Sequence, residues 1–374
     1  MKTILNEQEW IEIKIGRITL DGYCNYGNVL QSYALEQVLL RYADDVELIW
    51  HTNQSKLQYI SVPLSWKNCI KFLVNYHGFR DFMKVGYYSW EIVRRANIKR
   101  FCDTHIHIRY DLSLDQVCNK YDFFVVGSDQ VWNPYFENFD ISFLKFVSTK
   151  KRIAYAASIG LLSIPNHLKY DFCKNIGEMA HISVREQSGA KLIEQLTGKK
   201  CVVTLDPTLL LSAEEWNKIS CKPLWYDGTK YILTYFLGKT PDIVKHLTEI
   251  YKLKVINLLD KNNFDVYVTS PEEFIYLISH AELVYTDSFH GTVFSILFQR
   301  PFVCCNRIEK GGLNMTSRID ALLDLVNMQE RRGTAENQYS ILNPLEIVYP
   351  DVENILKQER EQSEAFIKRA LNLF

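Results

Sequence analysis

The feature that most constrains the fold is the stretch Leu283–Cys305, which reads as a buried strand, a polar hinge, a short helix and a second buried strand. The two predicted strands are short apolar runs at 283–286 and 302–305. Between them, Asp287 or Ser288 can cap a helix whose apolar residues recur near the helical period. A unit of this kind predicts an open α/β sheet, which binds ligands at the carboxyl ends of its strands.

The hinge itself is a candidate anion site, because free backbone N–H groups at the start of a helix attract negative charge. Ser288 and His290 lie in this hinge. Helix capping explains a serine or an aspartate there without any function, but it explains the histidine less well. The hinge alone therefore leaves a structural and a functional interpretation open.

Length and composition predict a two-domain globular protein. The chain has 374 residues, which is long for one core, with 47% hydrophobic and 23% charged residues. A net charge of −1 gives no global reason to bind nucleic acid. Nine cysteines without a Cys-x-x-Cys pair favour reduced, buried thiols over disulfides or zinc. With no signal-peptide run and no stretch of roughly 18 apolar residues, we expect a cytoplasmic protein.

The start of the chain resembles the opening of a βαβ unit. A strand over Ile11–Leu20 leads through the glycine-bearing turn at 21–28 into a helix. The turn contains Asn25, Gly27 and Asn28. It is neither a G-x-G-x-x-G fingerprint nor a P-loop, and a tight turn that needs glycine explains it equally well.

Three later strand ends carry polar groups suited to a binding pocket. The strand at 121–126 is followed by Gly127, Ser128, Asp129, Gln130 and Trp132, the strand at 152–158 ends at Ser158, and the strand at 182–184 is followed by Arg185 and Glu186. Capping explains Ser128 or Asp129 singly but not the whole group. An arginine at a strand end suits bidentate anion binding, although an Arg–Glu pair is often a structural ion pair.

The expected architecture is α/β, with two Rossmann-like domains. We place the first over 1–220, with a helical insertion at about 51–115, and the second over 229–350. A final helix over 351–374 is expected to pack back across the domain boundary. Within the second domain, the run near 265–268 is predicted to be a short strand.

Six motifs, taken in order, resemble the polysaccharide pyruvyl transferase family. They are Asn25-Tyr26-Gly27-Asn28 with Gln31, Val126–Trp132, Ser183–Glu186, Asp206-Pro207-Thr208, Asp287–Gly291 and Ser317-Arg318-Ile319. The resemblance covers nearly the whole chain, from about Arg17 to Val326. It implies two Rossmann-like domains facing across a cleft, the GT-B-like arrangement of one large class of glycosyltransferases.

The resemblance also implies an activity: transfer of pyruvate from phosphoenolpyruvate to two hydroxyls of a sugar, giving a cyclic ketal and phosphate. The acceptor it implies is a surface-polysaccharide precursor carried on a lipid diphosphate or a nucleotide, which leaves contact with the inner face of the cell membrane open. Phosphoenolpyruvate is then a donor substrate, and neither a metal nor a bound coenzyme is expected.

Matched residue by residue, Arg185 corresponds to the arginine that family members use on phosphoenolpyruvate, and His290 to the histidine of the hinge. Related enzymes often have Arg-Leu before that histidine, where this chain has Ser288-Phe289, so one positive charge is missing. The candidates to replace its role are the hydroxyl of Ser288 and the guanidinium of Arg307 or Arg318.

The roles that follow are expectations. His290 holds the departing phosphate and supplies a proton, Asp129 or otherwise Glu186 accepts a hydroxyl proton, and Trp132 stacks on the sugar. The predicted substrate-binding residues are Asn25, Gly27, Asn28, Gly127, Ser128, Gln130, Trp132, Ser158, Glu186, Ser288, Phe289, Gly291 and Arg318.

Two other functions fit the same residues. A nucleotide-sugar glycosyltransferase would also need a cleft and an anion site, but we identify no acid placed for a ribose. A non-catalytic sugar- or phosphate-binding homologue would keep the fold, and the missing arginine gives this alternative some weight.

Overall fold

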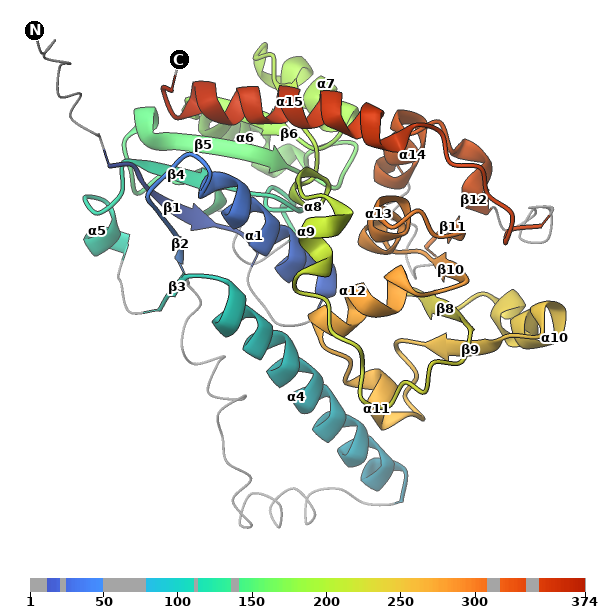
Figure 1. The fold of residues 1–374 in the computed structure, drawn as a ribbon. Helices are drawn as coiled ribbons and strands as arrows, with labels where there is room; N and C mark the ends of the chain where they lie inside the picture. The colour runs from blue at the N-terminus through green and yellow to red at the C-terminus, as the bar shows by residue number, and fades with distance from the viewer. Residues whose placement is uncertain are drawn as a thin grey trace, which may run out of the picture.

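The protein is described here from a computed structural model, which covers residues 12–20, 25–49, 79–110, 114–135, 141–307, 317–333 and 343–373 (Figure 1). Of the helical insertion predicted at about 51–115, residues 51–78 lie outside the described ranges. The rest of it includes one long helix, α4 (Phe79–His105), which runs from the first sheet down to the second half of the chain (Figure 1).

The first sheet is parallel, with seven strands in the order β3-β2-β1-β4-β5-β6-β7. They are β1 (Lys14–Ile18), β2 (Asp45–Ile49), β3 (Ile108–Arg109), β4 (Phe123–Val126), β5 (Arg152–Ala157), β6 (His181–Val184) and β7 (Val202–Val203). Strands β1 to β3 are added toward one edge of the sheet and strands β4 to β7 toward the other, so the strand order reverses between β1 and β4, as in a Rossmann fold. Ile18 pairs with Val126 at this switch point, so the ends of β1 and β4 form one edge of the crevice.

Helices cover both faces of the first sheet. Besides α4 they are α1 (Tyr26–Leu39), α5 (Leu114–Val117), α6 (Lys169–Gly177), α7 (Gln187–Thr197), α8 (Pro207–Leu210) and α9 (Ala213–Asn217). One face packs α6 and α7 into a core of its own. The other face packs α1 and α8, whose core continues without a break into the second half of the chain.

The second sheet is also parallel, in the order β12-β11-β10-β8-β9. Its strands are β8 (Tyr231–Tyr235), β9 (Lys254–Asn257), β10 (Leu283–Thr286), β11 (Phe302–Cys305) and β12 (Arg332–Gly333). This is the flavodoxin-like order, and its switch point lies between β8 and β10. Asp287 secures that point, because its carboxylate accepts hydrogen bonds from the backbone N–H groups of Leu237 (2.7 Å) and Gly238 (2.8 Å).

The helices of the second half are α10 (Leu247–Tyr251), α11 (Phe264–Tyr267), α12 (Pro271–Ser279), α13 (Phe289–Leu297), α14 (Ser317–Leu325) and α15 (Val352–Ala370). The prediction of a short strand near 265–268 is wrong, since these residues belong to α11 and the turn after it. The side chain of Asn263 caps this helix by accepting from Val266 N (3.3 Å). Local capping has outweighed the β-branched composition of the run.

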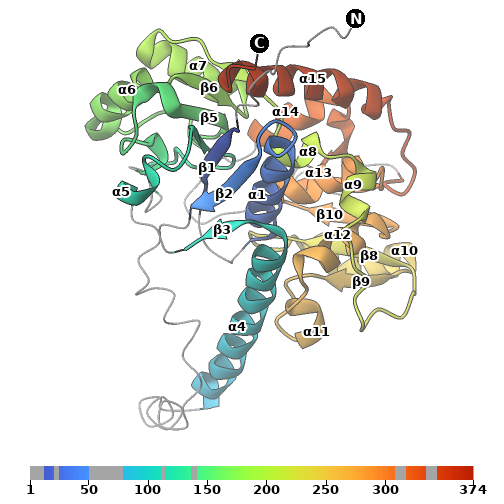
Figure 2. The same ribbon diagram turned by 60° about the vertical axis from the view of Figure 1, so that its left-hand side comes forward.

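The two halves are held together by aromatic packing and by the last helix. Tyr26 of α1 stacks on Phe274 of α12, with ring centroids 4.6 Å apart. Helix α15 runs from beside α14 back over the first sheet (Figure 2), where Ser363 Oγ accepts from Leu205 N (3.0 Å) and Phe366 contacts Tyr155. These contacts fix the carboxyl edges of both sheets relative to each other, as expected for two Rossmann-like units around a cleft.

One buried carboxylate of the first sheet gives a testable pH dependence. Glu47 of β2 binds Arg109, Lys120 and the hydroxyl of Tyr121. Burial would raise its pKa, but these hydrogen bonds outweigh burial and lower the pKa from 4.5 to about 2. The ionised form therefore stabilises the fold above pH 4.5, and that stabilisation is lost as the pH falls toward 2.

We expect Glu47→Gln to be less stable than the wild type at neutral pH and to lose less stability on acidification. Urea unfolding at a series of pH values between 5 and about 2 measures the difference. Identical pH dependence in the two proteins would show that Glu47 does not carry this stabilisation.

Candidate active site

The two halves of the chain meet at Gly27 and His290, which are the second residues of α1 and α13. A Cβ on Gly27 would lie 1.9 Å from His290 Nδ1, so the imidazole packs directly on the glycine backbone. Gly27 lies inside a helix, so a glycine-requiring turn does not explain it. The absence of a side chain is what lets the histidine approach the first half.

Asp206 lies at the centre of the site, although it was predicted only as part of a family motif and not as a site residue. Its Oδ2 accepts from Arg185 Nη1 (2.6 Å) and Ser128 Oγ (3.3 Å), and its Oδ1 lies 3.7 Å from His290 Nε2. Burial would raise the pKa of Asp206, but His290, Arg185 and the Thr208 hydroxyl outweigh it and hold the pKa well below its usual range. The carboxylate of Asp206 is therefore ionised and places a negative charge beside the ring of His290.

The sequence signal that could have found Asp206 is its position before a proline. Asp206 caps α8, with Pro207 at the first helical position, and its Oδ1 accepts from Thr208 N (3.0 Å) and Thr208 Oγ1 (2.6 Å). A capping aspartate before proline marks the start of a helix, and here that start faces the cleft.

Arg185 is a buried cation held by two carboxylates. Besides its bond to Asp206, its Nη2 donates to Asp129 Oδ1 (3.3 Å). Its guanidinium carbon lies 4.8 Å from the ring centroid of Phe289. Phe289, a predicted binding residue, therefore contacts the arginine of the site. Burial would lower the pKa of Arg185, but Asp206, Asp129 and Glu186 outweigh it and raise the pKa, so the charge is permanent.

Arg318 is a second buried arginine of the site and comes from α14. With the Gln130 amide oriented so that its oxygen faces the arginine, that oxygen accepts from Nη2 (2.9 Å) and Nη1 (3.2 Å). Asp129 Oδ1 lies 3.8 Å from Nη1. Burial, and then the charge of Arg185, lower the pKa of Arg318 to about 10. A bound anion would oppose both effects, so this position favours negative charge.

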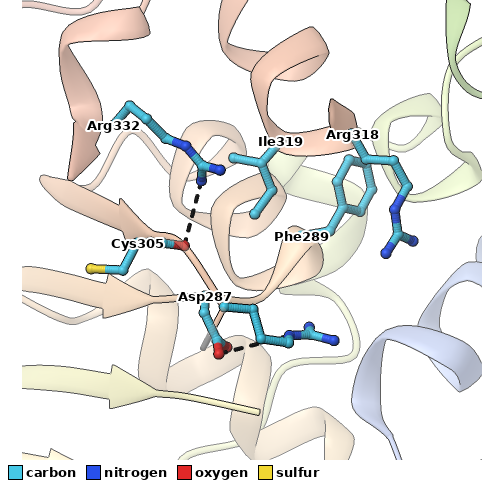
Figure 3. A pocket seen from close by; sticks show the side chains of 7 residues that line it. Asp287, Phe289, Cys305, Arg318, Ile319 and Arg332 are labelled. Carbon is cyan, nitrogen blue, oxygen red and sulfur yellow. Dashed lines mark hydrogen bonds and ion pairs between the residues drawn. The ribbon is translucent and has the colours of Figure 1, made fainter. Parts of the chain in front are cut away.

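Ser288 acts as a helix cap, because its Oγ accepts from Gly291 N (3.2 Å). Two arginines lie beside this hinge. Arg307 Nε is 3.7 Å from Asp287 Oδ2, and both Arg307 and Arg318 line a small pocket with Phe289. Figure 3 shows Arg318 next to the ring of Phe289, directly above this hinge. Arg307 and Arg318, which follow the hinge in the sequence, thus place positive charge beside it.

Several other predicted site residues position the loops that carry the site. A Cβ on Gly127 would lie 2.1 Å from Tyr155 O, and its φ of 128° suits glycine. Ser128 N donates to Gln31 Oε1 (3.0 Å), while Gln31 Nε2 donates to Thr19 Oγ1 (2.9 Å). Gln31 therefore ties together the loops that follow β1 and β4.

The remaining residues have mostly structural contacts. Asn25 caps α1 by accepting from Gly27 N (2.9 Å), and the Asn28 carbonyl accepts from Gln31 Nε2 (2.8 Å). Ser158 Oγ donates to Glu186 Oε1 (2.7 Å). A Cβ on Gly291 would lie 2.6 Å from Thr286 Oγ1, so this glycine allows α13 to start close against β10.

The prediction that Trp132 stacks on a sugar is wrong. Trp132 is fully buried, its ring stacks on Phe143 with centroids 5.9 Å apart, and its Nε1 donates to Ser142 O (3.1 Å). The chain after β4 turns this side chain into the core of the first half, where a large aromatic surface stabilises the fold.

Within the described ranges, no group of three or more His, Cys, Asp or Glu residues is arranged to hold a metal ion. Nor is any helix in that part of the chain long and apolar enough to cross a membrane.

Two Rossmann-like sheets with a cation-rich site between their carboxyl edges define an α/β protein of GT-B-like architecture. The chain belongs to the polysaccharide pyruvyl transferase family, whose model matches residues 25–308. Of the site residues described above, all except Thr19 and Arg318 lie within that match. No curated protein matches the sequence.

Solved structures with a similar chain path include UDP-GlcNAc 2-epimerases. That of Neisseria meningitidis bound to UDP-GlcNAc has 12% identity and a TM-score of 0.45, with 97% of this chain and 100% of that chain covered. That of Methanocaldococcus jannaschii, in complex with UDP-GlcNAc and UDP, has 15% identity and the same TM-score and coverage.

Proposed function

We propose that this protein transfers pyruvate from phosphoenolpyruvate onto two hydroxyls of a sugar in a surface-polysaccharide precursor carried on a lipid diphosphate or a nucleotide, forming a cyclic ketal. The observation that carries the proposal is the meeting of Arg185, Arg318 and His290 between the two sheets, in a member of this family. Phosphoenolpyruvate carries a phosphate and a carboxylate, which need cations and N–H donors. The N-termini of α1 and α13, which meet at Gly27 and His290, add such donors.

The reaction balances without a metal or an oxidant. A proton adds to the methylene carbon of phosphoenolpyruvate, and one sugar hydroxyl attacks the resulting cationic carbon and loses its proton. The C–O bond to phosphate then breaks, the second hydroxyl attacks the same carbon, and its proton leaves with the phosphate. The products are the ketal, which keeps the carboxylate, and hydrogen phosphate.

His290 is the proton donor in this scheme, because its ring lies where the two halves of the chain meet and its Nε2 has no hydrogen-bond partner within the described residues. Asp129 is directed at two arginines and orients them. Glu186 Oε2 is buried and accepts no hydrogen bond from the described part of the chain. We therefore assign the acceptance of the hydroxyl proton to Glu186 in preference to Asp129.

Binding of phosphoenolpyruvate alone tests the donor site. We expect titration calorimetry to detect binding to the wild type, and Arg318→Ala to weaken it roughly 10- to 100-fold, because hydrogen bonds to charged groups contribute about 1.5–3 kcal/mol. Arg95→Ala removes the same charge from the surface of α4, where Arg95 pairs with Glu91, and serves as the control. Absence of binding to the wild type, or equal loss in both variants, would rule out this donor site.

The close approach of the two halves gives a second prediction. We expect Gly27→Ala to lower kcat/KM for phosphate release from phosphoenolpyruvate about 100-fold, because the new methyl group must displace the His290 ring. Gly177→Ala is the matched control, since a Cβ there meets no atom within 4 Å. Wild-type activity in Gly27→Ala would show that the position of His290 does not matter for turnover.

A further inference from the structure

A cavity of about 350 Å³ opens beside the candidate active site. Arg185, Asp206, Phe289 and Arg318, which belong to the site, also line the cavity. Its other walls come from the edge of the first sheet, from α14 and from α15. The volume lies at the lower end of the range of roughly 300–1,000 Å³ that holds small-molecule ligands.

The walls of this cavity are mainly aliphatic. They are formed by Val203, Leu205, Leu209, Leu322 and Leu325. Thr204 is the one polar residue among them, and its buried hydroxyl already donates to Ser183 Oγ (2.9 Å). Gln187 and Asp324 are exposed and Glu359 is half-buried, so these three mark the mouth. Both arginines among the lining residues belong to the site.

The small pocket beside the hinge has the opposite character. It shares Phe289 and Arg318 with the cavity, but it is also lined by Arg307 and Arg332. Arg332 donates to the carbonyl of Cys305 at the end of β11 (3.4 Å; Figure 3). Phe289 and Arg318 therefore separate a cationic side of the site from an aliphatic side.

We propose that the aliphatic cavity is the acceptor subsite and that it takes an uncharged pyranose carrying an apolar substituent, such as an acetamido or a deoxy methyl group. This inference rests on the proposed pyruvyl transfer. A ring with a hydroxyl at every position would leave some of them facing aliphatic side chains without a hydrogen bond, which costs free energy. A methyl group in the same place gains from burial. The ring hydroxyls that react would face the donor bound at Arg185 and Arg318, and the negative charge of the donor would lie toward the cationic side.

The test uses three probes that differ at one substituent: methyl β-glucoside, its 6-deoxy derivative and its 2-acetamido derivative. Each is titrated into the wild-type protein saturated with phosphoenolpyruvate and followed by saturation-transfer NMR. We expect at least one of the two substituted glycosides to bind roughly fourfold tighter than the parent, or better, for one buried methyl group. The methyl protons of its substituent should receive the strongest saturation.

A substitution in α14 tests whether the glycosides bind in this cavity. Ala321 is exposed and lines the cavity, so Ala321→Trp is expected to fill the space, abolish the glycoside signals and leave the affinity for phosphoenolpyruvate unchanged. Ala321→Ser leaves the cavity open and is the control. Equal binding of the three probes, no binding of any, or unchanged binding by Ala321→Trp would overturn the inference.

The two proposals fail separately. If the wild type does not bind phosphoenolpyruvate, the donor site and thus the proposed function are contradicted, whichever glycosides bind. Normal phosphoenolpyruvate binding with no preference among the glycosides contradicts only the acceptor subsite. The saturation pattern of the wild type needs no variant, so the inference stays testable if Ala321→Trp does not fold.

Discussion

His290→Ala is expected to lower turnover by a factor of about 10²–10⁴ and to leave the fold intact. A positioned proton donor typically contributes this much, and the imidazole stands between Gly27 of the first half and ionised Asp206. Its Nε2 has no hydrogen-bond partner in the described part of the chain, so its removal orphans no donor or acceptor there. Phosphate release from phosphoenolpyruvate measures turnover, and thermal unfolding measures the fold.

A matched substitution separates chemistry from packing at this position. His290→Gln keeps a polar side chain of similar length but cannot carry a proton at neutral pH, so it should be as impaired as His290→Ala. Wild-type turnover in His290→Gln would remove the histidine from the proton transfer and leave it a packing role against Gly27.

Arg185→Ala is expected to lower the free energy of unfolding by about 3–5 kcal/mol, in addition to abolishing activity. The guanidinium is buried between Asp206 and Asp129, so its loss leaves the buried carboxylate of Asp206 and the half-buried carboxylate of Asp129 without their nearest cation. Urea unfolding of the wild type and the variant measures the difference. The burial of Arg185 thus adds a cost in stability to the loss of activity.

The partner of Arg185 allows a stricter test. Asp206→Asn removes the charge that Arg185 neutralises, so the double variant should be less destabilised than the sum of the two single variants. Additive losses would mean that the two side chains do not stabilise each other, despite their separation of 2.6 Å.

Much of the fold followed from local patterns. The hinge unit forms β10, α13 and β11 as expected, because short apolar runs and a capping serine are properties of neighbouring residues. The strand ends that carried Asp129, Arg185 and His290 were also predictable. In parallel α/β sheets the carboxyl ends of the strands share one edge, so polar residues there tend to converge.

Gly27 was predicted as a binding residue and Asp206 as part of a family motif, but what each of them does depends on contacts between distant segments. Gly27 resembles a turn glycine until His290, far along the chain, is seen to occupy the space beside it. Asp206 resembles an ordinary helix cap until Ser128, Arg185 and His290 converge on it. Trp132 follows a site strand in sequence, but its side chain turns the other way, into the core.

The account is tested most directly by mass spectrometry of surface glycans from cells that make this protein, compared with cells in which the His290→Ala variant replaces it. The account predicts a glycan that carries a pyruvate ketal in the first cells and the same glycan without the ketal in the second. An equal ketal content in both would contradict the proposed transfer and the role of His290 in it.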